Sequence, residues 1–204
     1  VLGVSFISFL APGLISMQVI QQSFSHSSSS FMIGKIQGNI VDLLYAPLSA
    51  AEVTIAVSLA SVTRAVMIAI ISIITFMLII EIQITNYLAL IAFTFLSSFI
   101  LGNVGIIAGL WSEKFDNMAT VTNFVIIPLS FLSGTFYSIE RLPGLLKTIS
   151  EFNPFFYMID GFRYSFIGQA DGSITVGLVY LTILSVVSWF ITYLLYKNGY
   201  KIKS

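Results

Sequence analysis

The chain has 204 residues, of which 57% are apolar and 9% are charged, and its mean hydropathy is +0.97. A soluble domain carries about a quarter charged residues, so this composition indicates an integral membrane protein. The formal net charge of zero argues against a nucleic-acid partner, and the absence of cysteine excludes disulfides and thiolate metal sites. We therefore expect an all-α, polytopic helical bundle in the membrane, with no cofactor.

The first apolar segment joins a hydrophobic half to a polar half. Residues 1–20 are apolar except where Pro12-Gly13 interrupts them, and QQSFSHSSSSF follows. We expect a span at about 6–30 whose polar half faces other helices; the alternative is a span at residues 1–20 followed by a serine-rich loop. The candidates for lining a substrate pathway in this segment are Gln18, Gln22 and His26, although a histidine inside a span more often packs between helices.

Residues 35–52, KIQGNIVDLLYAPLSAAE, form an amphipathic stretch between two apolar segments. The apolar residues fall on one face of a helix, the polar residues lie mostly on the other, and Pro47 ends that helix. Ser49 followed by Glu52 is typical of a capping box at the start of the next helix. The spacing predicts a short cytoplasmic helix, at about 34–47, across the ends of two spans. From the residues alone, a helix that only rests on the lipid headgroups is an equal alternative.

Four later segments are apolar enough to span a bilayer, which takes about 20 residues of helix. The first begins near Arg64, which we interpret as an interfacial anchor whose guanidinium snorkels to the headgroups rather than as a substrate ligand. Asn103 and Pro128, both inside spans, are interpreted as packing and kink residues. The predicted spans lie at about 60–80, 87–110, 118–137 and 174–196.

The connection between the last two spans is long and partly apolar. Leucine and isoleucine recur at helical spacing from Leu142 to Ile149, and Asn153-Pro154 breaks that helix. Aromatic residues and a second helix-like run to about residue 167 follow. Because each piece is too short to span, residues 140–167 are predicted to form outer interfacial or re-entrant helices.

The lysine-rich tail KNGYKIKS has no acidic residue and therefore predicts a cytoplasmic C-terminus. With five spans, the start of this chain is then outside, and the amphipathic stretch and the loop WSEKFDN are inside. On this assignment the inner cations, Lys35, Arg64, Lys114, Lys197, Lys201 and Lys203, outnumber the outer ones, Arg141, Lys147 and Arg163.

Signatures of catalysis are absent from the sequence. There is no G-x-x-x-x-G-K-[ST], whose backbone would cradle ATP phosphates, and no H-E-x-x-H. The single histidine excludes a histidine-rich metal centre and makes a Ser-His-Asp arrangement implausible. We therefore do not expect an enzyme.

Three stretches, in order along the chain, resemble one family, the type-2 ATP-binding-cassette (ABC) export permeases. FLAPGLISM at residues 9–17 is similar to the start of the family's second span, and GKIQGNIVDLLYAPLS at residues 34–49 to its first cytoplasmic loop. PLSFLSGTFYSIERLPGLLKTISEFNPFFYMIDGFRYSFIG, at residues 128–168, resembles the family's last-but-one span, its outer re-entrant helices and the segment that follows.

The resemblance implies an export permease in the plasma membrane, the inner membrane of a bacterium. The cytoplasmic loop would be a coupling helix that docks into a groove of a separate ATPase subunit, and a second permease chain, identical or different, would complete the pathway. The family has six spans, so the first is expected upstream of Val1. Members of the family export drugs, lipids, polysaccharides and other molecules, so the resemblance does not select a substrate.

The same resemblance suggests which residues carry these roles. Contacts with the ATPase subunit are expected from Gly34, Lys35, Gln37, Gly38, Ile40, Asp42, Leu43, Leu44 and Pro47. The outer gate is expected from Leu142, Pro143, Asn153, Pro154, Phe155, Tyr157, Asp160 and Arg163.

Two alternatives come from other functional classes. A secondary transporter driven by an ion gradient should show paired ionisable residues at mid-membrane, and the clean spans contain no acidic residue. A non-transporting membrane scaffold would neither bind an ATPase nor stimulate its turnover.

Overall fold

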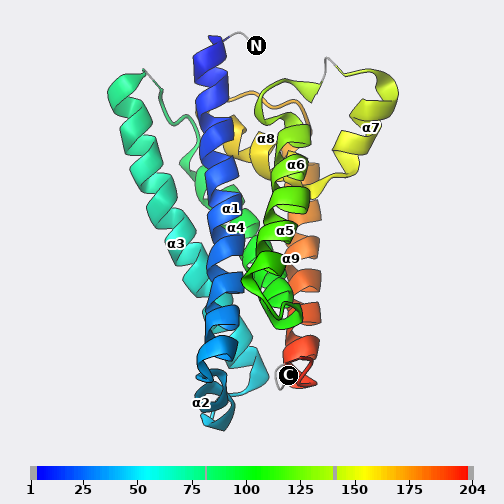
Figure 1. Ribbon diagram of the computed structural model, residues 1–204. Helices are drawn as coiled ribbons and strands as arrows, with labels where there is room; N and C mark the ends of the chain where they lie inside the picture. Colours follow the sequence, from blue (N-terminus) through cyan, green and yellow to red (C-terminus); the bar gives the residue numbers. More distant parts are fainter. Residues whose placement is uncertain (1–3, 81, 140–141, 202–204) are drawn as a thin grey trace.

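The computed structural model describes residues 4–80, 82–139 and 142–201, without the side chains of Val41, Leu43 and Leu44. All regular elements in this part of the chain are helices. Those long and apolar enough to cross a bilayer are α3 (Ala50–Ile79), α4 (Tyr87–Trp111), the helical run Phe115–Thr135 and α9 (Ile174–Lys197). The predicted fold class, a polytopic helical membrane bundle, is confirmed, with four such helices among the described residues (Figure 1).

The fifth predicted span falls in α1 (Phe6–Gln37), a helix of 32 residues that continues through the serine run. Two of these serines satisfy their hydroxyls within the helix, because Ser23 donates to the Val19 carbonyl (2.6 Å) and Ser28 to the Phe24 carbonyl (2.8 Å) of the preceding turn. A serine-rich loop after residue 20 is therefore wrong. The glutamines and serines make α1 less apolar than the four helices above, although it is long enough to cross a bilayer.

α1 is the central helix of the bundle and contacts α3, α4 and α8 (Pro154–Ile167). Its closest approach is to α4, where glycines face serines. A β-carbon on Gly105 would lie 2.5 Å from the Phe24 carbonyl oxygen, and one on Gly109 would lie 2.8 Å from that of Ser28. Small residues on both helices thus let the two backbones touch, which is the main source of packing energy between helices in a membrane.

α3 begins earlier than the predicted span. Ser49 accepts a hydrogen bond from the backbone N–H of Glu52 (3.3 Å), and the Glu52 carboxylate accepts one from the N–H of Ser49 (2.7 Å), so the predicted capping box is confirmed. Because this cap starts the helix at Ala50, Arg64 lies near the middle of α3 and not at its beginning.

Asn103 and Pro128, the predicted packing and kink residues, both lie in surroundings that fit these roles. Asn103 joins α4 to α3 by accepting a hydrogen bond from Ser58 (3.1 Å), and its amide donates to the Phe99 carbonyl (2.8 Å). Pro128 lies in α6 (Ile127–Ser130), between wider π-helical turns at Thr122–Ile126 and Phe131–Thr135 that follow α5 (Phe115–Val121). Proline has no N–H for the carbonyl four residues earlier, so an altered hydrogen-bond register around it is expected.

The two ends of the bundle carry different elements (Figure 1). α2 (Ile40–Tyr45) and the end of α9 lie at one end, which we call the α2 end. α7 (Gly144–Phe152), α8 and the start of α1 lie at the other, the α8 end. The two short helices separated at Asn153 are those that the sequence predicts between the last two spans.

The contact between α1 and α4 predicts an effect of one methyl group. Gly105→Ala should lower the free energy of unfolding by about 1–3 kcal/mol, because the new β-carbon meets a backbone oxygen that cannot move aside. The matched control is Gly144→Ala, since a β-carbon at Gly144 meets nothing within 4 Å. Thermal unfolding of the detergent-solubilised protein measures both, and equal melting temperatures for the two variants would contradict the close contact.

Candidate functional site

The amphipathic stretch at the α2 end forms two pieces. Gly34 to Gln37 belong to the last turn of α1, and only Ile40–Tyr45 form a separate helix, so the predicted helix at 34–47 is divided. The division falls at Gly38, whose φ of 77° is in the left-handed region that ends helices and favours glycine. α2 therefore follows α1 after one tight turn.

The predicted ATPase contacts differ in their accessibility. Gln37, Gly38, Asp42 and Pro47 are exposed, whereas Gly34 and Lys35 are half-buried and Ile40 is buried. The side chains of Leu43 and Leu44 lie outside the described part of the chain.

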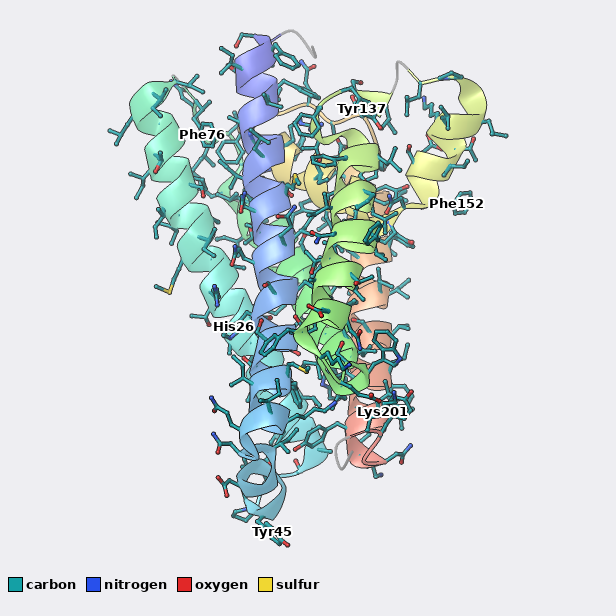
Figure 2. The ribbon with its side chains drawn as sticks, viewed as in Figure 1. His26, Tyr45, Phe76, Tyr137, Phe152 and Lys201 are labelled. Atoms are coloured by element: carbon teal, nitrogen blue, oxygen red, sulfur yellow. The ribbon has the colours of Figure 1, made fainter. Side chains whose placement is uncertain are left out.

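Two further apolar side chains, which the sequence reasoning missed, are exposed beside the predicted contacts. Tyr45 is 86% exposed, at the extreme tip of the α2 end (Figure 2), and Leu48 is 51% exposed. An aromatic residue that ends an amphipathic helix is the signal that the sequence offered for Tyr45. The exposed surface of Asp42, Tyr45, Pro47 and Leu48 is called the α2 tip below.

Lys35 faces the bundle and not the tip. Its ammonium donates hydrogen bonds to the carbonyls of Leu110 and Ser112 (both 2.8 Å) and Gly109 (3.4 Å), at the C-terminal end of α4. The last carbonyls of a helix lack partners within it and carry partial negative charge, so a cation is favourable there. Lys35 thus ties the end of α1, next to α2, to the end of α4.

At the α8 end, Arg163 is 1% exposed and bridges three elements. One guanidinium nitrogen donates to the carbonyls of Gly134 (2.6 Å) and Thr135 (3.3 Å), where the helical run Phe115–Thr135 ends. The guanidinium also lies 3.8 Å from the ring centroid of Phe9 on α1, a cation–π contact. Arg163 therefore joins α8 to α1 and to the end of that run.

Two carboxylates order the adjacent loops. Asp160, also buried, accepts hydrogen bonds from the backbone N–H groups of Asp171 (3.0 Å) and Gly172 (2.9 Å). Asp171 in turn accepts from the Ser138 hydroxyl (2.8 Å) and the Ile139 N–H (2.9 Å). Arg163, Asp160 and Asp171 are called the outer polar cluster below.

Burial raises the pKa of Asp160 to about 6, although both backbone N–H groups favour the charged form. The folded pKa lies above the ordinary value, so this group favours folding most strongly at low pH. That contribution is lost as the pH rises through about 6.

The other predicted gate residues lie around this cluster. Asn153 donates to the Ser133 hydroxyl (2.7 Å) and caps α8, which begins at Pro154, by accepting from the Phe155 N–H (3.1 Å). Tyr157 packs against Tyr180 of α9, with ring centroids 5.4 Å apart. Leu142 and Pro143 lie in the connection before α7, where the Leu142 N–H donates to the Ile139 carbonyl (3.0 Å); Leu142 is half-buried and Pro143 exposed.

The predicted pathway residues share one accessible face of α1. Gln18 is exposed, and Gln22 and His26 (labelled in Figure 2) are half-buried. Arg64 of α3 reaches this face: its guanidinium donates to the Gln22 side-chain oxygen (3.2 Å) and lies 3.3 Å from Nδ1 of His26. Sequence reasoning placed Arg64 at the lipid interface because no local pattern reveals which helix lies opposite it.

Known proteins were compared with this chain. The model of the ABC-2 type transporter family matches residues 1–167. The chain belongs to this family. It is also 30% identical, over 202 residues, to the inner membrane transport permease YadH of Escherichia coli (strain K12), and the match covers 99% of this chain and 79% of YadH. Nodulation protein J of Rhizobium leguminosarum bv. viciae is 26% identical over 200 residues, which cover 93% of this chain and 74% of that protein.

Family membership and the four apolar helices make the chain an integral, multi-pass membrane permease. The resemblance inferred from residues 9–17, 34–49 and 128–168 is thereby confirmed at the level of the family.

The outer polar cluster leads to a prediction about stability at the α8 end. Arg163→Met leaves the Gly134 and Thr135 carbonyls without their charged donor, so we expect a loss of about 1.5–3 kcal/mol in the free energy of unfolding. Compared with the unmodified protein, hydrogen exchange should become faster in residues 131–139 and stay unchanged at the α2 end. Lys147→Met on α7 is the control, and unchanged protection of residues 131–139 in Arg163→Met would contradict the role given to Arg163.

Proposed function

We propose that this chain is the membrane-spanning subunit of an ATP-driven exporter and that a separate ABC-type ATPase subunit docks on the α2 tip. The observation that carries this proposal is the exposed Tyr45 on a short helix that follows α1 after a single glycine turn. A docked partner would cover the exposed apolar surface, and its movement would reach α1 directly. Membership of the ABC-2 family supports an ATPase partner in general.

The proposal includes an orientation. The α2 end would face the cytoplasm, because Lys35, Lys114, Lys197 and Lys201 lie there, around the ends of α1, α4 and α9, and positive residues favour the inner side. The C-terminus is then cytoplasmic and the α8 end is outside. The similarity to YadH, an inner membrane transport permease, supports placement in a bacterial inner membrane, and a second permease chain, identical or different, would complete the pathway.

The mechanism follows from the continuity of α1. Closure of two ATPase subunits around ATP would displace α2, and α1 would carry that displacement along its 32 residues to the outer polar cluster. Lys35 would make the end of α4 move with it. The substrate would pass along the face of α1 that carries Gln18, Gln22 and His26, and α7 and α8 would form or gate the exit.

The chain's own residues favour this over the alternatives. It has no phosphate-binding glycine loop, so the energy would come from the partner. Acidic groups that bind the driving cation at mid-membrane are expected of an ion-driven transporter, but α1, α4 and residues 53–79 contain no acidic residue. A scaffold without transport activity would not stimulate the turnover of an ATPase.

Docking on the α2 tip predicts that a charge there releases the ATPase. Tyr45→Asp and Leu48→Asp should each weaken retention tenfold or more, because burying such a side chain contributes about 1.5–3 kcal/mol and tenfold in affinity corresponds to about 1.4 kcal/mol. The measurement is pull-down of the ATPase by the detergent-solubilised permease, with melting temperature as the check on folding.

The matched control is Tyr87→Asp, since Tyr87 is 66% exposed and begins α4 at the opposite end. It should retain the ATPase as the unmodified permease does. Normal retention and transport in both α2-tip variants would overturn the proposed docking site.

A further inference from the structure

Arg64 occupies an unusual position for a charged residue. It is the one charged side chain in residues 53–79 of an otherwise apolar span, and it is exposed on the surface of the described bundle. Its guanidinium points sideways to Gln22 and His26 of α1, with distances of 3.2 and 3.3 Å. An interfacial anchor would direct its charge along the helix toward the headgroups instead.

Three helices place Arg64 near the middle of the bundle's depth. Ser61, one turn before it, donates to the carbonyl of Ser98, which is the twelfth of the 25 residues of α4. Gln22 is the seventeenth of the 32 residues of α1, and Arg64 is the fifteenth of the 30 residues of α3. The guanidinium therefore lies well inside the bundle, away from both of its ends.

No carboxylate balances this charge within the described residues. The salt bridge found there joins Lys201 to Glu113 at the α2 end. Neither α1, α4 nor residues 53–79 contain an Asp or a Glu. A charge at mid-membrane is costly, and proteins that keep one use it on a substrate or ion pathway. The missing counter-charge is the feature that a ligand would supply.

The group formed by Arg64, Gln22 and His26 offers hydrogen-bond donors to such a ligand. Arginine has five N–H donors, and those on only two of its nitrogens contact Gln22 and His26. If His26 accepts at Nδ1 from Arg64, its neutral ring carries the proton on Nε2, which then becomes a second donor toward the same face. Gln18, one turn along α1, is exposed beside them.

We propose that Arg64, oriented by Gln22 and His26, binds the anionic head of the transported molecule, a phosphate or carboxylate on an amphiphile, between α1 and α3. This inference rests on the proposed export function and adds a substrate class to it. A guanidinium pairs with two oxygens of a phosphate or carboxylate at once, which an uncharged sugar or hydrocarbon cannot match. The mid-bundle depth favours a molecule in transit over a lipid of the surrounding bilayer.

The test measures equilibrium binding of radiolabelled dodecyl phosphate to the intact permease, purified in an uncharged maltoside detergent. We expect saturable binding of dodecyl phosphate by the unmodified permease. Arg64→Met should weaken this binding tenfold or more, because it removes a charge-assisted hydrogen bond. Arg64→Lys should be intermediate, because lysine keeps the charge but not the paired donors. Lys197→Met, which removes an exposed cation from the last turn of α9, should bind like the unmodified permease.

Two results would overturn the proposal. One is equal affinity for dodecyl phosphate in Arg64→Met and the unmodified permease, or no saturable binding at all. The other comes from nanodiscs of phosphatidylcholine with phosphatidic acid: if phosphatidic acid stays tightly held by the unmodified permease, is lost in Arg64→Met and displaces dodecyl phosphate, the site holds a bilayer lipid. Removing a charge from an apolar span should not lower the melting temperature, which checks the fold of Arg64→Met.

The binding assay needs no ATPase, so its outcome is separate from that of the docking test. Arg64→Met should still retain the ATPase in pull-down, because Arg64 lies far from the α2 tip in α3. Failure to bind dodecyl phosphate with normal ATPase retention would reject the anion site alone, whereas loss of retention in the α2-tip variants bears only on the docking site.

Discussion

The backbone contact between α1 and α4 is the constraint on which the rest of the structure depends. Gly105 and Gly109 leave no room for a side chain between these helices, and the serines of α1 keep its surface equally small. The contact explains how a helix as polar as α1 can occupy the centre of a membrane bundle. The hydroxyls of Ser23 and Ser28 bond to carbonyls of α1 itself, so they need no partner from the lipid, and Gln18 and Gln22 lie on one accessible face.

Because α1 is held along its length, its two ends are connected mechanically. At the α2 end, Lys35 fixes the last turn of α1 to the carbonyls of α4, and Gly38 turns the chain directly into α2. At the α8 end, Phe9 on α1 lies under the buried guanidinium of Arg163. The same helix also presents Gln22 and His26 to Arg64 at mid-depth. A displacement of α2 would therefore reach both the anion site and the outer polar cluster through one continuous helix.

Sequence patterns predicted the elements that depend on local chemistry. The capping box of Ser49 and Glu52, the break at Asn153 and the helical bundle itself follow from rules that act within a few residues. The contacts of the candidate site do not follow from such rules. The sequence predicts Lys35 as an ATPase contact and Arg64 as an interfacial anchor, and it does not reveal their partners Leu110 and His26, which are 75 and 38 residues away. Only the packing of α1 against α3 and α4 brings these groups together.

The most direct test of the proposed coupling is site-specific photocrosslinking in the assembled permease–ATPase complex. A benzophenone amino acid would replace Tyr45 at the α2 tip in one variant, and Phe152, 77% exposed at the end of α7, in another (both labelled in Figure 2). The account predicts a covalent product with the ATPase subunit from position 45 and none from position 152. Crosslinking to the ATPase from position 152, or none from position 45 in a complex shown to be intact, would contradict it.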